Sequence, residues 1–341
     1  MRYKSALAAA CFTILALCTK QSFSVEETDP QQLRPDGDES ELICVANHWA
    51  VWRTSELIEK TAGYRGRFYV HRFYRQRISE PLANFAFSGT GLVAYGRNMT
   101  IESDGAIVFV ERYTVRWCEP DRTMQSSEAV KEGMIRCLFV DGVVVQAGSR
   151  VINDGKDIEN ARASFIPFKG RSLDRAHEVQ IAPAGAKSLG YGGPVRHGHL
   201  LAWVTGETFY IFNLQSSTLA QVPTDGFNYA TCRITAFDGE TIVVMNLFAH
   251  DAKTGKRFAG SQVVGPGNLF AVRNRIGYGV RDGWIEATDL TTAVRPSVRL
   301  NATSGVPIGQ GTEGLMVWTG GKWKVVPWLS SVPNERTKMQ N

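Results

Sequence analysis

The sequence predicts an all-β fold built from repeated hairpin units, and two observations carry this prediction. First, one phrase occurs twice: glycine, glutamate and threonine followed by an alternating apolar strand begin at Gly206 and again at Gly239, a spacing of 33 residues. Second, tight-turn dipeptides separate apolar runs along the chain, at Asp104-Gly105, Asp141-Gly142, Thr205-Gly206, Asp238-Gly239, Asp282-Gly283 and Gly320-Gly321. Such dipeptides favour hairpins, because the turn that matches strand twist requires positive φ, which glycine and aspartate tolerate.

The runs between these turns have the two-residue periodicity of strands. Apolar residues recur at alternate positions, as at Phe209 and Ile211 or at Ile242 and Val244. This period places one set of side chains against a neighbouring sheet. Residues 42–52 form the earliest such run, one β-rich segment without an obvious turn.

The spacing of the turns indicates the size of the unit. The tight turns, and in two cases the full phrase, lie at positions 104, 141, 206, 239, 282 and 320, and a fainter copy of the pattern begins at Arg65. The long step from 141 to 206 holds either a degenerate unit around residues 177–181 or an insertion. Dividing residues 41–330 into seven gives about 41 residues per unit, the size of a four-stranded propeller blade. We therefore predict a β-propeller of seven blades, with six or eight as the alternatives.

The pattern resembles the broad β-propeller class that includes WD40-like, YVTN-like and quinoprotein-like repeats. The resemblance covers nearly all of the chain after its leader, and it is one of architecture only. The repeated Gly-His and Trp-Asp pairs of WD40 blades are missing from the sequence. No double glycine repeats from unit to unit as in kelch blades, and the sialidase box is missing as well. A pair of β-sandwich domains, or a six-bladed ring with longer insertions, would show similar turn spacing.

The strand pattern of the last unit ends near Trp328, and this unit contains two clear strands. A ring needs its first and last blades joined, and a strand from residues 42–52 would remove the exposed edge of the last blade. We expect this N-terminal strand to close the ring.

The N-terminus has the pattern of a secretory signal peptide. Arg2 and Lys4 precede an apolar segment that is too short to span a bilayer, and small residues follow at Ser22 and Ser24. We expect a signal peptide at residues 1–24, a flexible acidic lead-in at 25–40, the propeller at 41–330 and a polar tail at 331–341. The mature chain is then extracytoplasmic, periplasmic or secreted, without a transmembrane segment.

The charge of the mature chain argues against nucleic acid as a partner, and its cysteines allow disulfide bonds. Loss of residues 1–24 lowers the formal charge from +5 to +2, so the mature chain lacks the basic excess of a nucleic-acid-binding protein. Four cysteines remain, at positions 44, 118, 137 and 232. In an oxidising compartment they allow three disulfide pairings, and buried free thiols are the alternative. We expect a monomer.

Residues 65–77 concentrate positive charge and aromatic rings. Arginine binds carboxylates, sulfates and phosphates bidentately, and aromatic rings stack on sugars. Our candidate ligand-binding residues are Arg65, Arg67, Tyr69, His71 and Arg75. As a strand, positions 67, 69, 71, 73 and 75 share one face, which fits an anionic glycan or an acidic protein surface. The competing interpretation is a solvated outer strand whose rings pack between blades.

His197 and His199 form the one histidine pair with a spacing that suits a metal, because residues two apart on a strand face the same side. Further ligands would have to come from elsewhere, and an adjacent Gly-Gly-Pro sequence favours a loop, so we predict neither a metal nor another cofactor. Local catalytic motifs are missing from the sequence. We therefore expect a binding module for a protein partner or glycan at one ring face, with a secreted polysaccharide hydrolase or lyase, or a quinoprotein-like oxidoreductase, as the alternative.

Overall fold

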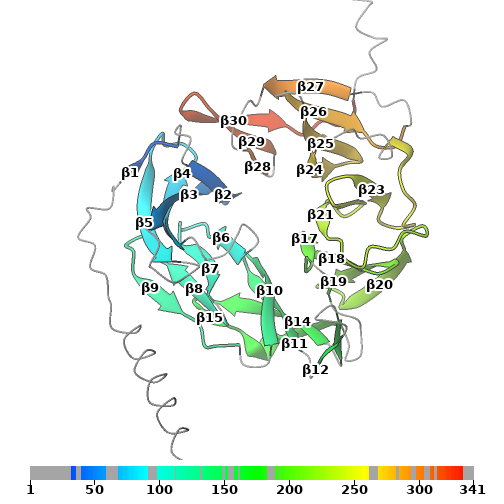
Figure 1. Ribbon diagram of the computed structural model, residues 1–341, viewed down its shortest axis with the longest axis horizontal. Coiled ribbons are helices and arrows are strands. Elements are labelled where there is room, and N and C mark those ends of the chain that lie inside the picture. Colours follow the sequence, from blue (N-terminus) through cyan, green and yellow to red (C-terminus); the bar gives the residue numbers. More distant parts are fainter. Residues whose placement is uncertain are drawn as a thin grey trace, which may run out of the picture. The chain divides into compact units, whose positions relative to one another are not determined.

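Seven antiparallel sheets follow one another around a ring in the computed structural model of this protein (Figure 1). The structure describes residues 32–35, 40–58, 68–90, 98–111, 113–130, 133–147, 150–152, 157–159, 162–182, 189–190, 192–260, 268–281, 284–292, 297–302, 308–310 and 313–332. The all-β class and the seven-bladed propeller predicted from the sequence are confirmed.

Each blade is a sheet whose strands follow in chain order from the ring centre outward. The first blade holds β2 (Ser40–Ala46), β3 (Trp49–Ile58), β4 (Phe68–Arg77) and β5 (Ala83–Thr90), with β1 (Gln32–Leu33) added outside β5. The second holds β6 (Met99–Ile101), β7 (Ile107–Glu111), β8 (Thr114–Cys118) and β9 (Met124–Ser126). The third holds β10 (Gly133–Phe139), β11 (Gly142–Ala147) and β14 (Arg162–Lys169), and both β15 (Ser172–Leu173) and β16 (Val179–Ala182) pair with β14.

The remaining four blades have three or four described strands each. The fourth holds β17 (Val195–His197), β18 (Leu200–Thr205), β19 (Thr208–Asn213) and β20 (Thr218–Pro223). The fifth holds β21 (Ile234–Phe237), β22 (Thr241–Val244) and β23 (Phe248–Asp251). The sixth holds β24 (Asn268–Arg273), β25 (Ile276–Arg281), β26 (Trp284–Asp289) and β27 (Ser297–Ala302). The seventh holds β28 (Ile308–Gln310), β29 (Gly314–Thr319) and β30 (Lys322–Pro327).

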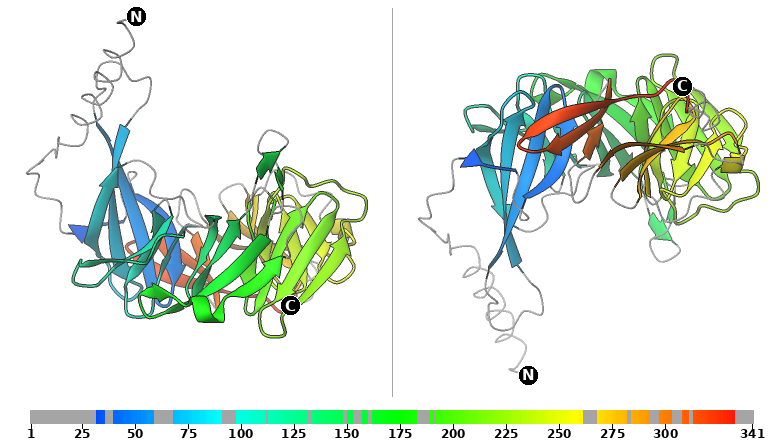
Figure 2. Two further views of the ribbon diagram at one scale, coloured as in Figure 1. Left: turned by 90° about the horizontal axis from the view of Figure 1, so that it is seen from below. Right: turned by 90° about the horizontal axis from the view of Figure 1, so that it is seen from above.

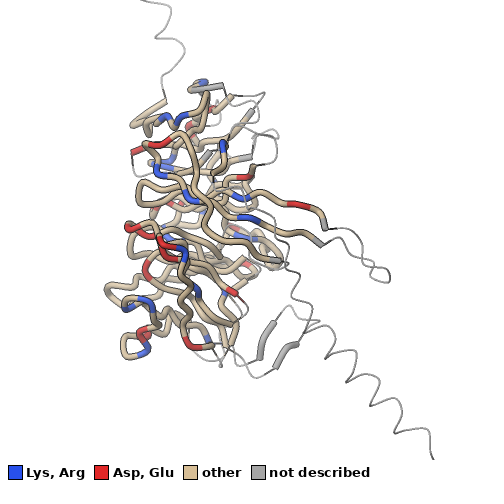
Figure 3. The backbone as a smooth tube through the Cα atoms, turned by 90° about the vertical axis from the view of Figure 1, so that its left-hand side faces the viewer, with Lys and Arg blue, Asp and Glu red and all other residues tan. Residues whose placement is uncertain are grey.

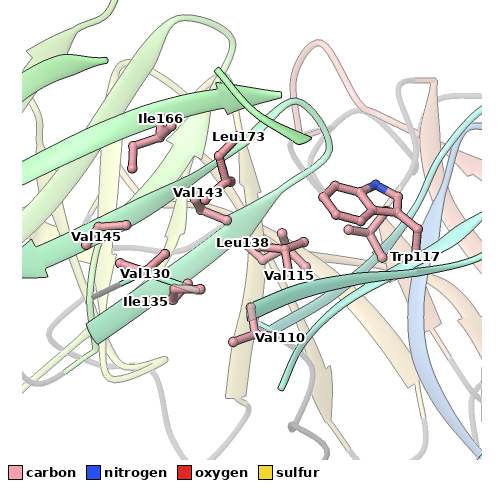
Figure 4. Packing of buried hydrophobic residues seen from close by; sticks show 11 residues of the cluster. Val110, Val115, Trp117, Val130, Ile135, Leu138, Val143, Val145, Ile166 and Leu173 are labelled. Atoms are coloured by element: carbon pink, nitrogen blue, oxygen red, sulfur yellow. The ribbon is translucent and has the colours of Figure 1, made fainter. Parts of the chain in front are cut away.

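The hydrophobic core lies between the blades rather than inside any one of them. Alternate residues of each sheet face opposite neighbours, so successive clusters of buried side chains join one blade to the next. Figure 4 shows the cluster between the second and third blades, where Val115 and Trp117 meet Leu138 and Val143, all nearly inaccessible to solvent. The described part of the chain contains no helix with the length and hydrophobicity of a membrane span.

The predicted closure of the ring by the N-terminal strand is not confirmed. The run 42–52 is divided by a two-residue turn at Asn47 and His48, both with positive φ, so its two halves pair with each other as β2 and β3. This turn contains no glycine, so it lacks the Asp-Gly or Gly-Gly dipeptide that marks the other hairpins in the sequence. The sequence pattern therefore predicted a single uninterrupted strand here. The first and seventh blades are joined by side chains instead, among them Trp52, Trp318 and Trp323.

One buried glutamine completes this closing junction, which we define as Trp52, Gln76, Trp318 and Trp323. The Gln76 side-chain oxygen accepts hydrogen bonds from the indole N–H of Trp52 at 2.8 Å and of Trp323 at 3.1 Å. The Gln76 amide nitrogen donates to the backbone oxygen of Glu80 at 2.8 Å. Two blades that are farthest apart in the sequence are therefore fastened by a fully buried polar group whose hydrogen bonds are satisfied.

The long step between positions 141 and 206 contains an insertion. The hairpin of β12 (Arg150–Ile152) and β13 (Asp157–Glu159) lies between β11 and β14, and residues 177–181 belong to the third blade rather than to a unit of their own. The lead-in also differs from expectation, because Gln32 and Leu33 pair with Asn84 and Ala83 as β1. Leu33 packs against the core between the first and seventh blades, which supplies the burial that orders this short segment.

The two ring faces carry different turns. The turn between the first and second strands of every blade lies on one face, and the turn between the second and third strands lies on the other, which we call the second-turn face. Figure 2 shows the long ribbon of β3, β4 and β5 and the β12–β13 hairpin projecting from the same side of the ring, the second-turn face.

Candidate functional site

The candidate site is centred on β4, the strand that carries the predicted ligand-binding residues. Arg65 and Arg67 lie outside the described residues. Tyr69, His71 and Arg75 occupy alternate positions on one face of β4, as the two-residue period predicted. The structure places them in different surroundings, because β4 runs from the projecting end of the ribbon into the junction between the first and second blades.

At the projecting end, four residues form a surface that we call the first-blade platform: Ser55 and Leu57, which are exposed, and Tyr69 and His71, which are half-buried. The rings of Tyr69 and His71 stack with centroids 6.1 Å apart and planes 14° from parallel. Directly across the strand pair, the hydroxyl of Ser55 lies 2.8 Å from the His71 Nδ1, and Leu57 faces Tyr69 with 52% of its surface exposed. The platform therefore offers stacked rings and an aliphatic edge to solvent.

His71 is a neutral ring in this setting. Burial lowers the pKa of its imidazole, the nearby Arg53 lowers the pKa further, and Glu41 opposes them. Because an ordinary histidine already has a pKa near 6.5, the neutral form dominates at pH 7. A neutral ring stacked on a phenol is a surface for packing and hydrogen bonding rather than a cation.

The arginines around the platform are engaged within the protein. Arg72 pairs with Glu56 at 2.6 Å, and Arg53 pairs with Glu41. At the other end of β4, away from the platform, the guanidinium of Arg77 lies 5.3 Å from the centre of the Trp49 ring. Figure 3 shows both charge signs along the described part of the projecting ribbon. The positive charge that the sequence concentrates here is thus partly cancelled in the fold.

Arg75 joins two blades. Its side chain is 5% exposed, and its guanidinium donates to the backbone oxygens of Gly105 at 2.8 Å and Glu119 at 2.6 Å in the second blade. Phe73, one step earlier on the same face, stacks on Phe87, which in turn stacks on Phe109 of the second blade. The inner half of this face therefore packs between blades, as the competing interpretation held, and we leave Arg75 out of the ligand-binding surface.

A second feature of the same face is a hollow of about 440 Å³ in the third blade. Its floor is formed by Val145 and Ala147 at the end of β11, where the inserted hairpin begins. Its polar lining comes from Arg162, Ser164, Arg175, Glu178 and Gln180. Arg175 pairs with Glu178 at 3.3 Å, whereas Arg162 is exposed and forms no ion pair with any acidic residue whose side chain the structure describes. The volume is within the range of small-molecule sites.

The sequence did not reveal this third-blade hollow. Its polar residues come from β14, β16 and the short 3-10 helix Arg175–His177 with its C-terminal neighbour, all within the step from 141 to 206 that had no clear repeat. The one available signal was the interruption of the repeat itself, because insertions in repeat proteins map to loops on one face.

A larger hollow of about 620 Å³ lies among the first strands of the first four blades. It is lined by Val45, Ala46, Met99, Thr100, Cys137, Leu138, Phe139, Val140, Pro194, Val195, Arg196 and Gly198. This lining contains no carboxylate and no histidine. Arg196 is its one charged side chain, and both of its terminal nitrogens contact the carboxylate of Asp141. The groups that acid–base catalysis requires are therefore missing from the lining of this hollow.

The histidine pair does not form the same-side arrangement of a strand. His197 ends β17, Gly198 has φ of +55°, and His199 is the second residue of the turn into β18. No group of three or more histidine, cysteine, aspartate or glutamate side chains among the described residues is placed to hold a metal. The four cysteines at positions 44, 118, 137 and 232 are free thiols, and Cys118 and Cys137 are buried.

Comparisons with known proteins identify no family for this chain. No protein-family model and no curated protein matches the chain. Similar solved structures include the β-propeller domain of the Trilobed protease from Pyrococcus furiosus, described as having an open velcro topology, at 12% identity and a TM-score of 0.42 over 86% of this chain and 99% of that one. Another is the AfRom2 CNH domain, at 10% identity and 0.39 over 86% and 99%. A chain of the mitotic checkpoint complex has 9% identity and 0.39 over 67% and 78%.

Proposed function

We propose that this protein is an exported binding module that holds an anionic glycan on its second-turn face. Two observations carry the proposal: a partly exposed aromatic platform in the first blade and an arginine-containing hollow in the third. Rigid blades position such surfaces, which suits recognition and requires no chemistry of the protein.

Each part of the face suits one part of such a ligand. The stacked rings of Tyr69 and His71 offer a flat apolar surface against which the C–H face of a sugar packs. In the hollow, Arg162 presents a planar guanidinium group, which can bind a carboxylate or sulfate through two parallel hydrogen bonds. Ser164 and Gln180 add neutral groups suited to hydroxyls.

A protein partner with an acidic surface is the competing occupant of this face. The described residues offer less for an enzyme, because the lining of the 620 Å³ hollow contains no carboxylate and no histidine. The Ser55–His71 contact also lacks the orienting carboxylate of a catalytic triad, since no described carboxylate is hydrogen-bonded to His71.

The test is a glycan array probed with residues 25–341 and with two variants. We expect binding to uronic-acid or sulfated glycans, loss of that binding in the Tyr69→Ala/His71→Ala double variant, and a weaker loss in Arg162→Gln. Tyr113→Ala is the control, because Tyr113 is a tyrosine on the second-turn loop of the second blade, 57% exposed and outside the platform. If the double variant and the control behave alike, the platform does not bind glycan.

Export rests on the leader pattern of residues 1–24. N-terminal sequencing of the protein recovered outside the cytoplasm should begin at Val25. A chain recovered in the cytoplasm with its leader intact would contradict this part of the proposal and leave the binding face untouched.

A further inference from the structure

The outermost strand of the seventh blade is an open sheet edge. β30 is the third strand of this blade, and no described strand pairs with its outer side. Five of the other six blades carry at least four strands. After β30 the chain turns towards the sixth blade, where Trp328 packs on Tyr278 and the backbone N–H of Leu329 donates to the Tyr278 hydroxyl. The described residues beyond β30 therefore leave its outer side uncovered.

The pairing register shows which backbone groups point outward. Thr319 and Lys322 flank the two-residue Gly320-Gly321 turn and exchange backbone hydrogen bonds with each other. In an antiparallel pair every second residue bonds to the partner strand, so Lys322 and Lys324 bond to β29 through their backbone groups. The backbone groups of Trp323 and Val325 then face away from β29. No hydrogen bond from a described residue reaches these two N–H groups. The backbone of Pro327 also faces away from β29, but proline has no N–H to donate. The part of the edge that can pair with another strand is therefore about one short strand long.

The side chains of this edge define its charge. Lys322, Lys324 and Val325 are exposed, and neither lysine pairs with a described acidic residue. Lysines on an edge repel a second copy of the same strand, and they attract a strand that carries acidic residues. Val325 points to the other side of the sheet, next to Trp323 of the closing junction.

We propose that β30 accepts an extended acidic segment of a partner protein as a fourth strand of the seventh blade. Backbone hydrogen bonds to Trp323 and Val325 would hold the segment, and alternate acidic side chains would face Lys322 and Lys324. The intervening apolar side chains would cover Val325. This site is on the outer rim of the ring, and it is independent of the glycan-binding face.

The experiment measures binding of a labelled peptide that alternates glutamate and valine, EVEVEV, to residues 25–341 by fluorescence anisotropy. We expect saturable binding that is about tenfold weaker in the Lys322→Glu/Lys324→Glu variant, because two exposed charge pairs become repulsive. The lysine peptide KVKVKV should show the reverse preference. The matched control is Lys253→Glu/Lys256→Glu, which reverses two exposed lysines of the fifth blade and should leave binding unchanged.

A backbone variant separates strand addition from simple charge attraction. Val325→Pro removes an outward N–H without removing a bond to β29, and Val325→Thr keeps the N–H with a similar shape. Binding that survives Val325→Pro in a folded protein would overturn the proposal. A chain that starts at residue 32 and binds EVEVEV more tightly than the longer chain would show that the acidic residues 25–31 occupy the edge instead. No binding to either chain would also overturn it.

Discussion

The fifth and seventh blades each have three strands, and they differ in how the third strand is covered. In the fifth blade the following segment lies along β23, where the Phe258 N–H donates to the Ala249 oxygen at 2.9 Å and the Asp251 N–H donates to the Lys256 oxygen at 2.9 Å. In the seventh blade the chain departs and β30 stays uncovered among the described residues. A blade in this ring therefore does not need a fourth strand of its own, provided that side chains fasten it to its neighbours.

The fastenings of the two blades also differ. His250 of β23 is fully buried, and its Nε2 lies 2.9 Å from the Tyr229 hydroxyl while its Nδ1 lies 2.9 Å from the Gly255 oxygen. The closing junction of the seventh blade uses indole rings and the amide of Gln76 instead. The contacts of the fifth blade include a histidine, which can take up a proton in mild acid, whereas the closing junction has no titratable side chain. The stability of the two blades should therefore depend differently on pH.

The largest expected effect comes from breaking the closing junction itself. Trp52→Ala removes a fully buried indole that contacts Trp318 and Trp323, and we expect the free energy of unfolding to fall by about 3–5 kcal/mol. Urea denaturation measures the change. Trp284→Ala, which truncates a tryptophan that is 38% exposed, is the control and should have a much smaller effect. Equal losses in the two variants would mean that the junction does not hold the ring closed.

A subtler change removes only the polar part of that junction. Gln76→Leu keeps most of the volume but leaves the indole N–H groups of Trp52 and Trp323 without their acceptor. We expect a loss of about 2 kcal/mol in the free energy of unfolding, since each unpaired buried donor is costly. If the variant is as stable as the natural chain, packing alone fastens the two blades.

The fifth blade should respond to acid in a way that the closing junction does not. Burial is the main cause that lowers the pKa of His250 below its ordinary value, so the unfolded chain binds a proton there more readily than the folded one. Stability contributed by this group is therefore complete above about pH 6.5 and declines below it, by up to about 1.4 kcal/mol per pH unit. His250→Gln should make the pH dependence between 5 and 6.5 shallower. An equally steep pH dependence in His250→Gln would contradict this role for the buried imidazole.

The smallest expected effect concerns the segment that covers β23. The guanidinium of Arg257 lies 4.2 Å from the centre of the Phe248 ring and 5.1 Å from that of Phe227. Arg257→Gln should cost about 0.5–1 kcal/mol of stability, the size of a partly exposed cation–π contact. Hydrogen exchange at Phe258 would also become faster. The outcome that counts against this view is unchanged exchange there, because the segment would then be held by its backbone bonds alone.

The fold class followed from the sequence because hairpins are local. The turns at 205–206 and 320–321 are tight turns between paired strands, with positive φ at Gly206, Gly320 and Gly321. The two copies of the repeated phrase are not equivalent in the ring, however. Gly206 precedes β19, the third strand of its blade, whereas Gly239 precedes β22, the second strand of the next. The phrase specifies a hairpin, and hairpins alone do not number the strands of a blade.

The candidate site was only partly predictable for a related reason. The alternation along β4 correctly placed Tyr69, His71 and Arg75 on one face, but it did not show where the neighbouring blade begins to cover that face. Burial of Arg75 depends on Gly105 and Glu119, which are 30 and 44 residues away in the chain. Such partners become visible only when the blades are placed side by side.

The absence of a shared strand between the first and seventh blades among the described residues has a consequence for how the chain reaches its native state. Every described strand pair joins segments of the same blade, so each sheet completes its hydrogen bonds from a contiguous stretch of chain. A polypeptide emerging from its N-terminus can therefore assemble blade after blade, without holding an early segment in reserve for the last one. The final step is then the docking of two finished surfaces through tryptophan side chains.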